Sequence, residues 1–346
     1  MKFYEAISEL NINLENRLFT VCDGIHAGEK MIVSGGEPVW KSDDAGFFSV
    51  HAAEVISAEN GKLAVIDGSR VFAELLGNEK KIVICGAGHV SMPVIEIAKM
   101  LGFRVTAIDD RAQFVQNALD HGADEGICSG FEEALAGIPG DPDTFFIIVT
   151  RGHMSDSECL LSIVSKPHAY VGMIGSRRKV GMVKQMLADA GVPDDVIESV
   201  HTPIGLDIGA ETPEEIAVSI IAEIIDVKSK NKRSTCIPPD VLAALADEGR
   251  SPAVLATIIS KHGSSPRAAG TRMLVKEGGV IIGTIGGGCA EATVINYASE
   301  VIRNLDAKEK NEAVSPVIMH VDMTGNDVAE SGMICGGVIE VLLEVV

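Results

Sequence analysis

The chain has 346 residues, too many for one average hydrophobic core and enough for two domains. Hydrophobic residues make up 46% of it and charged residues 23%, which is typical of folded globular proteins and excludes a disordered chain. With 49 acidic and 29 basic residues the formal net charge is -20, so the field of the whole protein repels nucleic acid and anionic lipid. We therefore expect no nucleic acid and no membrane among its partners.

The first residues contain no basic segment followed by an apolar one, and no later run approaches the length of a membrane span. We therefore expect a cytoplasmic protein. The seven cysteines are an odd number and include no Cys-x-x-Cys pair. This spacing argues against a disulfide framework and against a structural zinc site, and we predict no bound metal.

Residues 1–80 form a segment of their own, in which two apolar runs are similar to runs near the end of the chain. Gly28–Val33 parallels Gly270–Val275, and Val71–Leu76 parallels Val341–Val346. The matches are short, so the segment is either a degenerate partial repeat of the C-terminal domain or a pair of coincidentally similar strands. If the repeat is real, the N-terminal copy lacks the glycine-rich and serine-rich turns of the other copy.

From Lys81 onward the pattern changes to alternating strands and helices. We predict a strand over Lys81–Cys85, a glycine turn, a helix over Met92–Leu101 and a second strand over Phe103–Ile108. Such alternation implies an α/β fold in which helices cover a parallel sheet, here a Rossmann-like domain over residues 81–230.

Two further short apolar runs, Phe145–Val149 and Tyr170–Ile174, are predicted to be buried strands of the same sheet. A long helix from Pro213 to about Val227 closes the domain. Its start is the clearest helix signal in the chain, because Thr212-Pro213-Glu214-Glu215 has the pattern of a capping box with proline at the first helical position.

Residues 228–239 are first basic, then polar, and end in paired prolines, and we predict a linker over residues 231–239. A smaller α/β domain follows over residues 240–346. Its predicted strands are Ala253–Ser260, Arg272–Val275 and Val338–Val346, and a helix is expected from about Ala290 to Leu305, after three consecutive glycines.

The glycine turn after the first strand of the Rossmann-like domain has the form of a dinucleotide-binding fingerprint. Gly86-Ala87-Gly88-His89-Val90-Ser91 follows a strand and opens a helix, although serine stands in place of the third glycine. Asp109 ends the next strand, where a carboxylate can accept hydrogen bonds from a ribose hydroxyl and would repel a 2′-phosphate. Gly86, Gly88, His89 and Asp109 are therefore the candidate site for NAD or an adenine nucleotide. The alternative is a scaffold that keeps the turn without binding a dinucleotide.

Two further features lie where the carboxyl ends of the strands are expected. His153 and Asp156 form either a general base with its orienting carboxylate or a helix-capping loop. The string Gly175-Ser176-Arg177-Arg178-Lys179 supplies positive charge at the same edge, either to hold a phosphate or as a solvated helix start.

The smaller domain combines two cysteines with glycine turns. Cys289 follows Gly286-Gly287-Gly288 at the expected first turn of a helix, where backbone N–H groups and the helix dipole favour a thiolate. Cys335 is followed by two glycines, and the loop His262–Arg267 adds hydroxyl donors and a basic end. We predict an anion pocket in which the two thiols have the chemical role, although each cysteine alone could be an inert core residue. The candidate binding residues of this pocket are Ser265, Arg267, Gly286, Gly287, Gly288, Glu291 and Gly336.

Several of these strings resemble the XdhC/CoxI family. The Rossmann half of that family is similar to the turn Gly86–Val90, to Asp109-Asp110-Arg111, to Tyr170–Arg178 and, most specifically, to the long string from His201 to Ile220. The other half resembles Gly263–Arg267, the turn Gly286–Glu291 and Cys335-Gly336-Gly337, so the resemblance covers about residues 81–346. Family members usually place the cysteine-bearing half first, whereas here it comes last.

The resemblance implies a maturation factor for molybdenum hydroxylases similar to xanthine dehydrogenase or aldehyde oxidoreductase. Such a protein is expected to bind molybdenum cofactor (molybdopterin) as cargo, to keep it while its sulfido ligand is installed, and to hand it to the client hydroxylase. A cysteine desulfurase is then a further expected partner, and a homodimer the expected assembly. The phosphate, pterin and metal-dithiolene ends of the cargo would meet helix N–H groups, hydroxyl donors and thiols.

The leading hypothesis is thus a cofactor-insertion chaperone and not a turnover enzyme. The alternative is an NAD-dependent oxidoreductase acting on a small molecule, with His153 as proton carrier and the smaller domain as a lid. A third hypothesis is a redox-sensing or structural interaction module whose Rossmann-like domain is only a scaffold.

Overall fold

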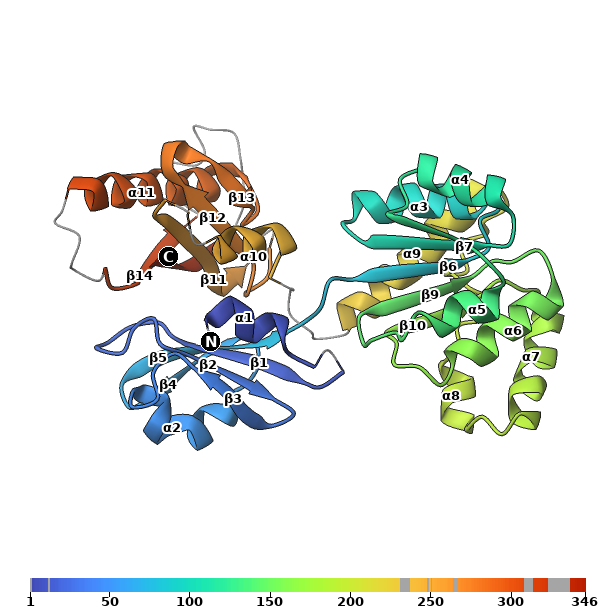
Figure 1. Ribbon diagram of the computed structural model, residues 1–346, viewed down its shortest axis with the longest axis horizontal. Coiled ribbons are helices and arrows are strands. Elements are labelled where there is room, and N and C mark those ends of the chain that lie inside the picture. Colours follow the sequence, from blue (N-terminus) through green and yellow to red (C-terminus); the bar gives the residue numbers. More distant parts are fainter. Residues whose placement is uncertain are drawn as a thin grey trace. The chain divides into compact units, whose positions relative to one another are not determined.

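The computed structural model describes residues 2–11, 13–230, 237–247, 249, 251–263, 267–307, 314–322 and 337–346. The chain forms two compact units (Figure 1). The first unit combines Met1–Asn78 with Arg233–Val346, and the second is the stretch between them, Glu79–Lys232. The two ends of the chain therefore belong to one unit, into which the second unit is inserted.

The second unit is built on a five-stranded parallel sheet over its described residues. Its strands are β6 (Lys81–Cys85), β7 (Arg104–Asp109), β8 (Glu125–Cys128), β9 (Thr144–Ile148) and β10 (Tyr170–Met173). Neighbouring strands are parallel and follow the order β10-β9-β6-β7-β8. The direction of winding reverses between β6 and β9, as in doubly wound folds that bind ligands beyond the carboxyl ends of their strands. The predicted Rossmann-type parallel sheet is confirmed.

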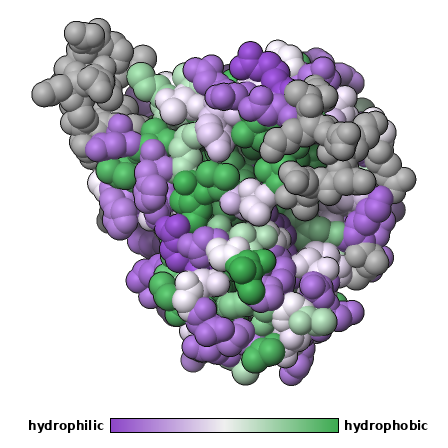
Figure 2. Space-filling view, turned by 90° about the vertical axis from the view of Figure 1, so that its left-hand side faces the viewer, coloured by the Kyte–Doolittle hydropathy of each residue, from purple (hydrophilic) through white to green (hydrophobic). Residues whose placement is uncertain are grey.

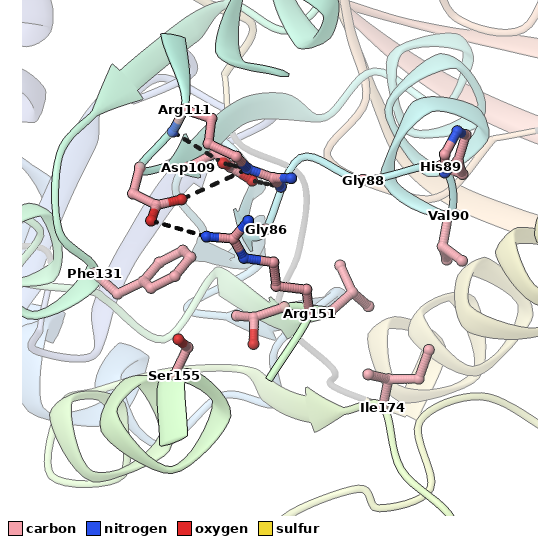
Figure 3. Close-up of a pocket in the computed structure, with 13 residues that line it drawn as sticks. Gly86, Gly88, His89, Val90, Asp109, Arg111, Phe131, Arg151, Ser155 and Ile174 are labelled. Carbon is pink, nitrogen blue, oxygen red and sulfur yellow. Dashed lines mark hydrogen bonds and ion pairs between the residues drawn. The ribbon is translucent and has the colours of Figure 1, made fainter. Parts of the chain in front are cut away.

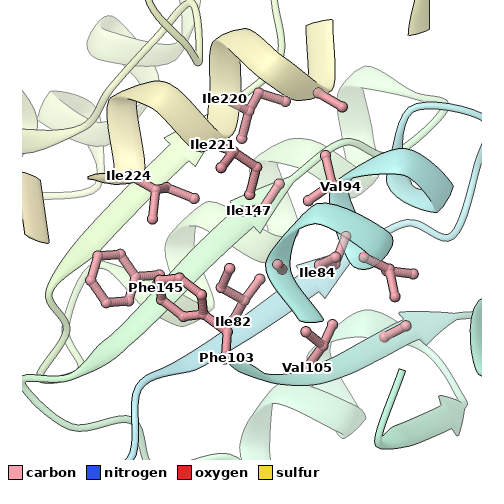
Figure 4. Close-up of a cluster of buried hydrophobic side chains, with 14 of the residues drawn as sticks. Ile82, Ile84, Val94, Phe103, Val105, Phe145, Ile147, Ile220, Ile221 and Ile224 are labelled. Atoms are coloured by element: carbon pink, nitrogen blue, oxygen red, sulfur yellow. The ribbon is translucent and has the colours of Figure 1, made fainter. Parts of the chain in front are cut away.

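Helices cover both faces of this sheet. On one face lie α3 (Ser91–Met100), α4 (Ala112–Asp120) and α9 (Pro213–Lys230), and on the other lie α5 (Phe131–Ala136), α6 (His153–Ile163), α7 (Arg177–Asp189) and α8 (Asp194–Ser199). Figure 4 shows isoleucines of α9 directed toward Val94 of α3 and toward the strand residues Ile82 and Ile147. The central strands are buried on both sides, as their continuous apolar sequences predict.

Helix α9 begins with the capping box that its sequence predicts. The Glu215 N–H donates to Thr212 Oγ1 at 3.2 Å, and the Thr212 N–H donates to Glu215 Oε2 at 3.0 Å. Hydrogen bonds from the Glu211 and Thr212 N–H groups hold the pKa of the Glu215 carboxyl below its usual value.

The first unit contains, among its described residues, two five-stranded antiparallel sheets with one topology. The N-terminal sheet follows the order β3-β2-β1-β5-β4, and the C-terminal sheet follows the order β13-β12-β11-β15-β14. We call residues 1–78 the N-terminal copy and residues 237–346 the C-terminal copy. In both, the elements follow one another along the chain in the same order.

The elements of the N-terminal copy are α1 (Phe3–Ser8), β1 (Asn16–Val21), β2 (Lys30–Ser34), β3 (Glu37–Lys41), α2 (Phe47–Ile56), β4 (Lys62–Ile66) and β5 (Ser69–Leu76). Those of the C-terminal copy are α10 (Pro239–Ala246), β11 (Ala253–Gly263), β12 (Arg272–Lys276), a short 3-10 helix (Glu277–Gly279), β13 (Ile281–Gly283), α11 (Gly288–Ala307), β14 (Val317–Asp322) and β15 (Gly337–Val345). Helix α11 begins two residues earlier than its sequence predicts, at Gly288 instead of Ala290.

The strand registers show which residues of the two copies are equivalent. Lys30 and Arg272 lie opposite equivalent residues of the central strands β1 and β11, and so do Glu74 and Glu344. Lys30 therefore corresponds to Arg272, and Glu74 corresponds to Glu344. The two pairs of similar runs in the sequence occupy these same strands, β2 with β12 and β5 with β15. Residues 1–80 and 240–346, separate segments in the sequence analysis, pack into one unit.

In each copy one helix covers one face of the sheet. Helix α2 packs on side chains such as Phe19 and Val33, and α11 packs on side chains such as Val254 and Met273. The face of the first unit in Figure 2 has hydrophobic residues gathered near the middle of the view, with hydrophilic residues around them.

None of the helices in the described ranges is long and apolar enough to cross a membrane.

A buried ion pair joins the two copies. The Arg272 guanidinium on β12 donates to both carboxylate oxygens of Glu74 on β5, and also to the Gly270 carbonyl oxygen at 3.0 Å. The Arg272 side chain is 4% exposed and the Glu74 side chain 1%. A charge buried to this degree is costly without its partner, so each residue depends on the other.

Removing one member of this pair should therefore cost more than removing both. Arg272→Met leaves the Glu74 carboxylate buried without its partner, and we expect the free energy of unfolding to fall by about 3–5 kcal/mol. The double variant Glu74→Leu/Arg272→Met should recover most of that loss. Lys62→Met, which breaks the exposed pair with Glu59, is the control and should change stability by about 1 kcal/mol or less. Urea unfolding of the four proteins measures these values, and a double variant no more stable than Arg272→Met would contradict the prediction.

Candidate functional site

A pocket lies in the second unit where the winding reverses. A cavity of about 290 Å³ opens at the carboxyl ends of β6, β7, β9 and β10 (Figure 3). Its lining includes the four residues predicted for a nucleotide and two arginines: Gly86, Gly88, His89, Asp109, Arg111 and Arg151. The fold thus brings the predicted residues together at the position where doubly wound sheets bind ligands.

The turn after β6 is shaped by its glycines. Gly86 has a φ of 101°, and a Cβ there would lie 2.7 Å from the Val149 carbonyl oxygen. A Cβ on Gly88 would meet no atom within 4 Å, so a ligand could approach this part of the backbone. Ser91, in place of the third glycine, is fully buried and its hydroxyl donates to the Gly86 carbonyl. In Figure 3 His89 lies apart from the charged residues, on the opposite side of the pocket.

Asp109 is buried, and its carboxylate is already engaged. It accepts hydrogen bonds from the Ala87 N–H at 2.9 Å, from the Arg111 N–H at 3.1 Å and from the Arg111 guanidinium at 2.8 and 2.9 Å. Burial opposes ionisation, but the hydrogen bonds from Arg111 and Ala87 outweigh it and hold the pKa of Asp109 below its usual value. These donors use the roughly four acceptor sites of a carboxylate. Asp109 therefore ties the end of β7 to the glycine turn, and a ribose hydroxyl could bind it only by displacing a donor.

Two arginines and a second aspartate form the charged wall of the pocket. The Arg111 guanidinium lies over the Phe114 ring, 3.5 Å from its centroid, and 3.6 Å from the Asp110 carboxylate. Arg151, which follows β9, is 66% exposed and lies 3.4 Å from the same carboxylate. Figure 3 shows the two guanidinium groups beside the acidic residues. Neither arginine is among the predicted binding residues, although each follows the end of a predicted strand.

The structure also bears on the pair His153 and Asp156. Asp156 is buried and accepts a hydrogen bond from the Thr150 hydroxyl at 2.6 Å, while α6 begins at His153. Asp156 therefore holds the loop between β9 and α6, while the N-cap residue Gly152 has no side-chain cap, and both alternatives for the pair stay predictions. The side chains of His153 and of residues 177–179 lie outside the described part of the chain.

In the C-terminal copy the three glycines form the turn before α11. Gly286, Gly287 and Gly288 have φ values of 122°, 76° and 69°, a region that other residues rarely adopt. Glu291 reaches back to this turn, and its Oε2 accepts the Thr284 hydroxyl at 2.5 Å and the N–H groups of Ile285 and Gly287 at 3.0 Å. Burial opposes ionisation, but these donors hold the pKa of Glu291 below its usual value. Glu291 thus shapes the turn and occupies two of the donors expected for an anionic ligand.

Cys289 is exposed at the first turn of α11, where the sequence predicts it. A Cβ on the neighbouring Gly287 would meet no atom within 4 Å, so the turn leaves open space beside the thiol. Arg267 is exposed in the segment between β11 and β12. Ser265, Cys335 and Gly336 lie outside the described residues, and the meeting of the two thiols in one pocket stays a prediction.

The long string after His201 forms a loop held by one carboxylate that sequence reasoning did not single out. Glu223 on α9 accepts hydrogen bonds from the Tyr170 hydroxyl at 2.5 Å and the Gly205 N–H at 2.8 Å, and lies 3.0 Å from His201 Nδ1. Burial opposes ionisation of Glu223, but these partners lower its pKa, whereas burial raises the pKa of Tyr170. The loop Pro203–Ala210 borders a second cavity, of about 330 Å³.

Two domain models of one family match separate stretches of the chain. The XdhC Rossmann domain matches residues 82–224, within the second unit. The XdhC and CoxI family domain matches residues 246–309, within the C-terminal copy. Each of the two matches therefore falls on one of the folded parts described above.

Two curated relatives match about half of the chain. The uncharacterised protein YqeB of Escherichia coli (strain K12) is 34% identical over 160 residues, which is 46% of this chain and 29% of that protein. A protein of Bacillus subtilis (strain 168) named as a probable xanthine dehydrogenase subunit is 28% identical over 162 residues, or 47% of each chain. The chain thus spans less than half the length of these relatives.

A crystal structure described as that of a xanthine dehydrogenase from Bacillus halodurans aligns with 64% of this chain and 64% of its own, at 22% identity and a TM-score of 0.49. At this level of similarity the alignment carries no functional argument. The two domain matches, one on the second unit and one on the C-terminal copy, show that this protein belongs to the XdhC and CoxI family.

Proposed function

We propose that this protein is a maturation factor for a molybdenum hydroxylase of the xanthine dehydrogenase type. The observation that carries the proposal is the presence of both family domains on one chain. The relative named as a xanthine dehydrogenase subunit supports the class of client. The protein acts on its client hydroxylase and has no metabolite of its own to turn over.

The cargo in this proposal is molybdenum cofactor, received at the glycine turn of the C-terminal copy. The exposed Cys289 thiol stands at the start of a 20-residue helix, where the first backbone N–H groups have no partner within the helix. Such groups suit the phosphate of the cargo, and a thiolate suits its metal or its sulfur. The cargo is sulfurated with the help of a cysteine desulfurase and then delivered to the client.

A nucleotide is the second ligand, bound in the pocket of the second unit. The open backbone at Gly88 suits a pyrophosphate, and Arg151 can turn from Asp110 toward an anion because it is largely exposed. The two arginines of the wall are balanced by Asp109 and Asp110. Because no net positive charge remains to attract a 2′-phosphate, NAD or an adenine nucleotide is favoured over NADP.

The thiol role predicts a specific defect. Cys289→Ser should leave folding nearly unchanged, because the exposed thiol contributes little packing. The variant should lower cofactor retention and client activation by about tenfold or more, which corresponds to a loss of about 1.4 kcal/mol in binding free energy. Cys335→Ser should behave in the same way. The measurement is molybdenum and pterin content per protein, together with activation of a cofactor-free hydroxylase.

The matched control is Cys128→Ser, which alters another exposed cysteine, at the end of β8 in the second unit. This variant should retain and deliver cofactor as the wild type does. If Cys289→Ser and Cys335→Ser match the wild type in both measurements, the thiols are structural and the proposed cargo contact is wrong.

The nucleotide pocket predicts that replacing either of two nearby glycines by alanine has a different effect on stability and on NAD affinity. Gly88→Ala meets no protein atom, so stability should hold within about 0.5 kcal/mol, while NAD affinity should fall by about tenfold. Gly86→Ala places a Cβ against the Val149 carbonyl, so it should destabilise the fold by more than about 1 kcal/mol. Calorimetric titration with NAD, NADP and ADP, alongside thermal unfolding, measures both effects. Wild-type protein that binds none of the three, or that binds NADP most tightly, would refute this part of the proposal.

A further inference from the structure

Each sheet of the first unit has its longer helix, α2 or α11, on one face, and its strands are buried on both faces. In the N-terminal copy, Phe19 and Val21 of β1 face α2, while Leu18 and Thr20, which alternate with them, are also buried. In the C-terminal copy, the residues of β11 that alternate with those facing α11 are buried as well. These second faces are covered in part by the short helix of the same copy, α1 or α10, and in part by the other copy.

Charged contacts between the copies are reciprocal. Arg272 of the C-terminal copy pairs with Glu74 of the N-terminal copy. Their equivalents, Lys30 of the N-terminal copy and Glu344 of the C-terminal copy, pair with each other in the opposite sense. An interface in which position i meets position j and position j meets position i is the isologous contact of a two-fold dimer.

Residues near the centre of this interface meet their own counterparts. Phe72 and Leu342 occupy equivalent positions on β5 and β15, and both belong to one buried apolar cluster with Cys22 and Ile259. Two residues before each of them lie Arg70 and Glu340, which form an ion pair at 3.1 Å. The pairing is thus that of two related subunits around a pseudo-two-fold axis, with both subunits on one chain.

The two copies differ at the turn before their longer helix. In the N-terminal copy the Phe47 N–H at the start of α2 donates to Glu29 Oε2 at 2.7 Å, and the carboxylate occupies the space that a side chain at Gly46 would need. The strand pairings make Lys41 equivalent to Gly283, and Phe47 and Cys289 each lie six residues further along the chain. The N-terminal turn is filled by the chain itself, and only the C-terminal turn presents a thiol.

We infer that residues 1–78 act as a built-in partner subunit for the C-terminal copy. The partner that this face fits is a second copy of the same fold, and the chain supplies that copy itself. The face is therefore closed to a second chain, and the expected homodimer does not form through it. This inference concerns assembly and does not depend on the proposed cargo.

Charge reversal of the less buried pair can distinguish one chain from two. Lys30→Glu and Glu344→Lys each place like charges together, and each should lower the midpoint of thermal unfolding by several degrees. The double variant in one chain should restore the midpoint. The decisive sample is a co-expression of the two single variants, because across a two-chain interface each variant would supply the charge that the other lacks. We expect no restoration in that sample.

Restoration on co-expression would overturn the inference, and so would single reversals that unfold at the wild-type midpoint. Lys184→Glu, which reverses an exposed charge paired with Glu198 in the second unit, is the control for charge reversal itself. Light scattering gives an independent reading on the wild type and on Lys30→Glu. We expect one molar mass for both proteins, whereas a wild-type dimer that dissociates on Lys30→Glu would place this interface between chains.

Discussion

The first unit depends on one constraint: each sheet has a second face that the short helix of its own copy, α1 or α10, covers only in part, and the rest of that face must be buried against something else. Each copy has such a second face, lined with leucines and isoleucines and bearing one acidic and one basic residue on the two strands that flank the central strand. Apolar area of this kind drives association, and the charged pairs fix its register, because an uncompensated buried charge is costly. The position of the Cys289 turn rests on this arrangement, since α11 packs on the sheet that the N-terminal copy supports.

In the second unit a different interaction sets the site. Asp109 uses its carboxylate to join the end of β7, the side chain of Arg111 and the glycine turn after β6. Once these groups are fixed, Arg151 is the more exposed cation of the pocket, paired with the half-exposed Asp110. The pocket therefore combines a hydrogen-bonded base with one exposed cation, which suits a ligand that carries phosphate.

Much of the fold could be predicted from sequence because its signals are local. The strand Lys81–Cys85 and the capping box at Thr212 are specified by neighbouring residues, and the structure has both as predicted. The role of Asp109 could not be predicted in this way, because it depends on which donors reach the carboxylate in three dimensions. Glu291 is a similar case: its spacing from the glycines suggests a ligand contact, but the helix turns its carboxylate back onto the backbone. The pairing of the copies could not be predicted either, because a strand that is buried on both faces has the same apolar sequence pattern whatever covers it.

The insertion of the second unit between the two copies has a consequence for how the chain folds. Glu74 and Arg272 are separated by 198 residues, and Lys30 and Glu344 by 314. During synthesis the N-terminal copy emerges before its partner copy, whereas the five strands of the Rossmann-like domain lie within residues 81–173 and pair with one another, so this domain can fold once its own helices have been made. The N-terminal copy must wait with an apolar sheet face exposed until the last strand, β15, has been made. The long interval exposes this face to aggregation while the rest of the chain is being made.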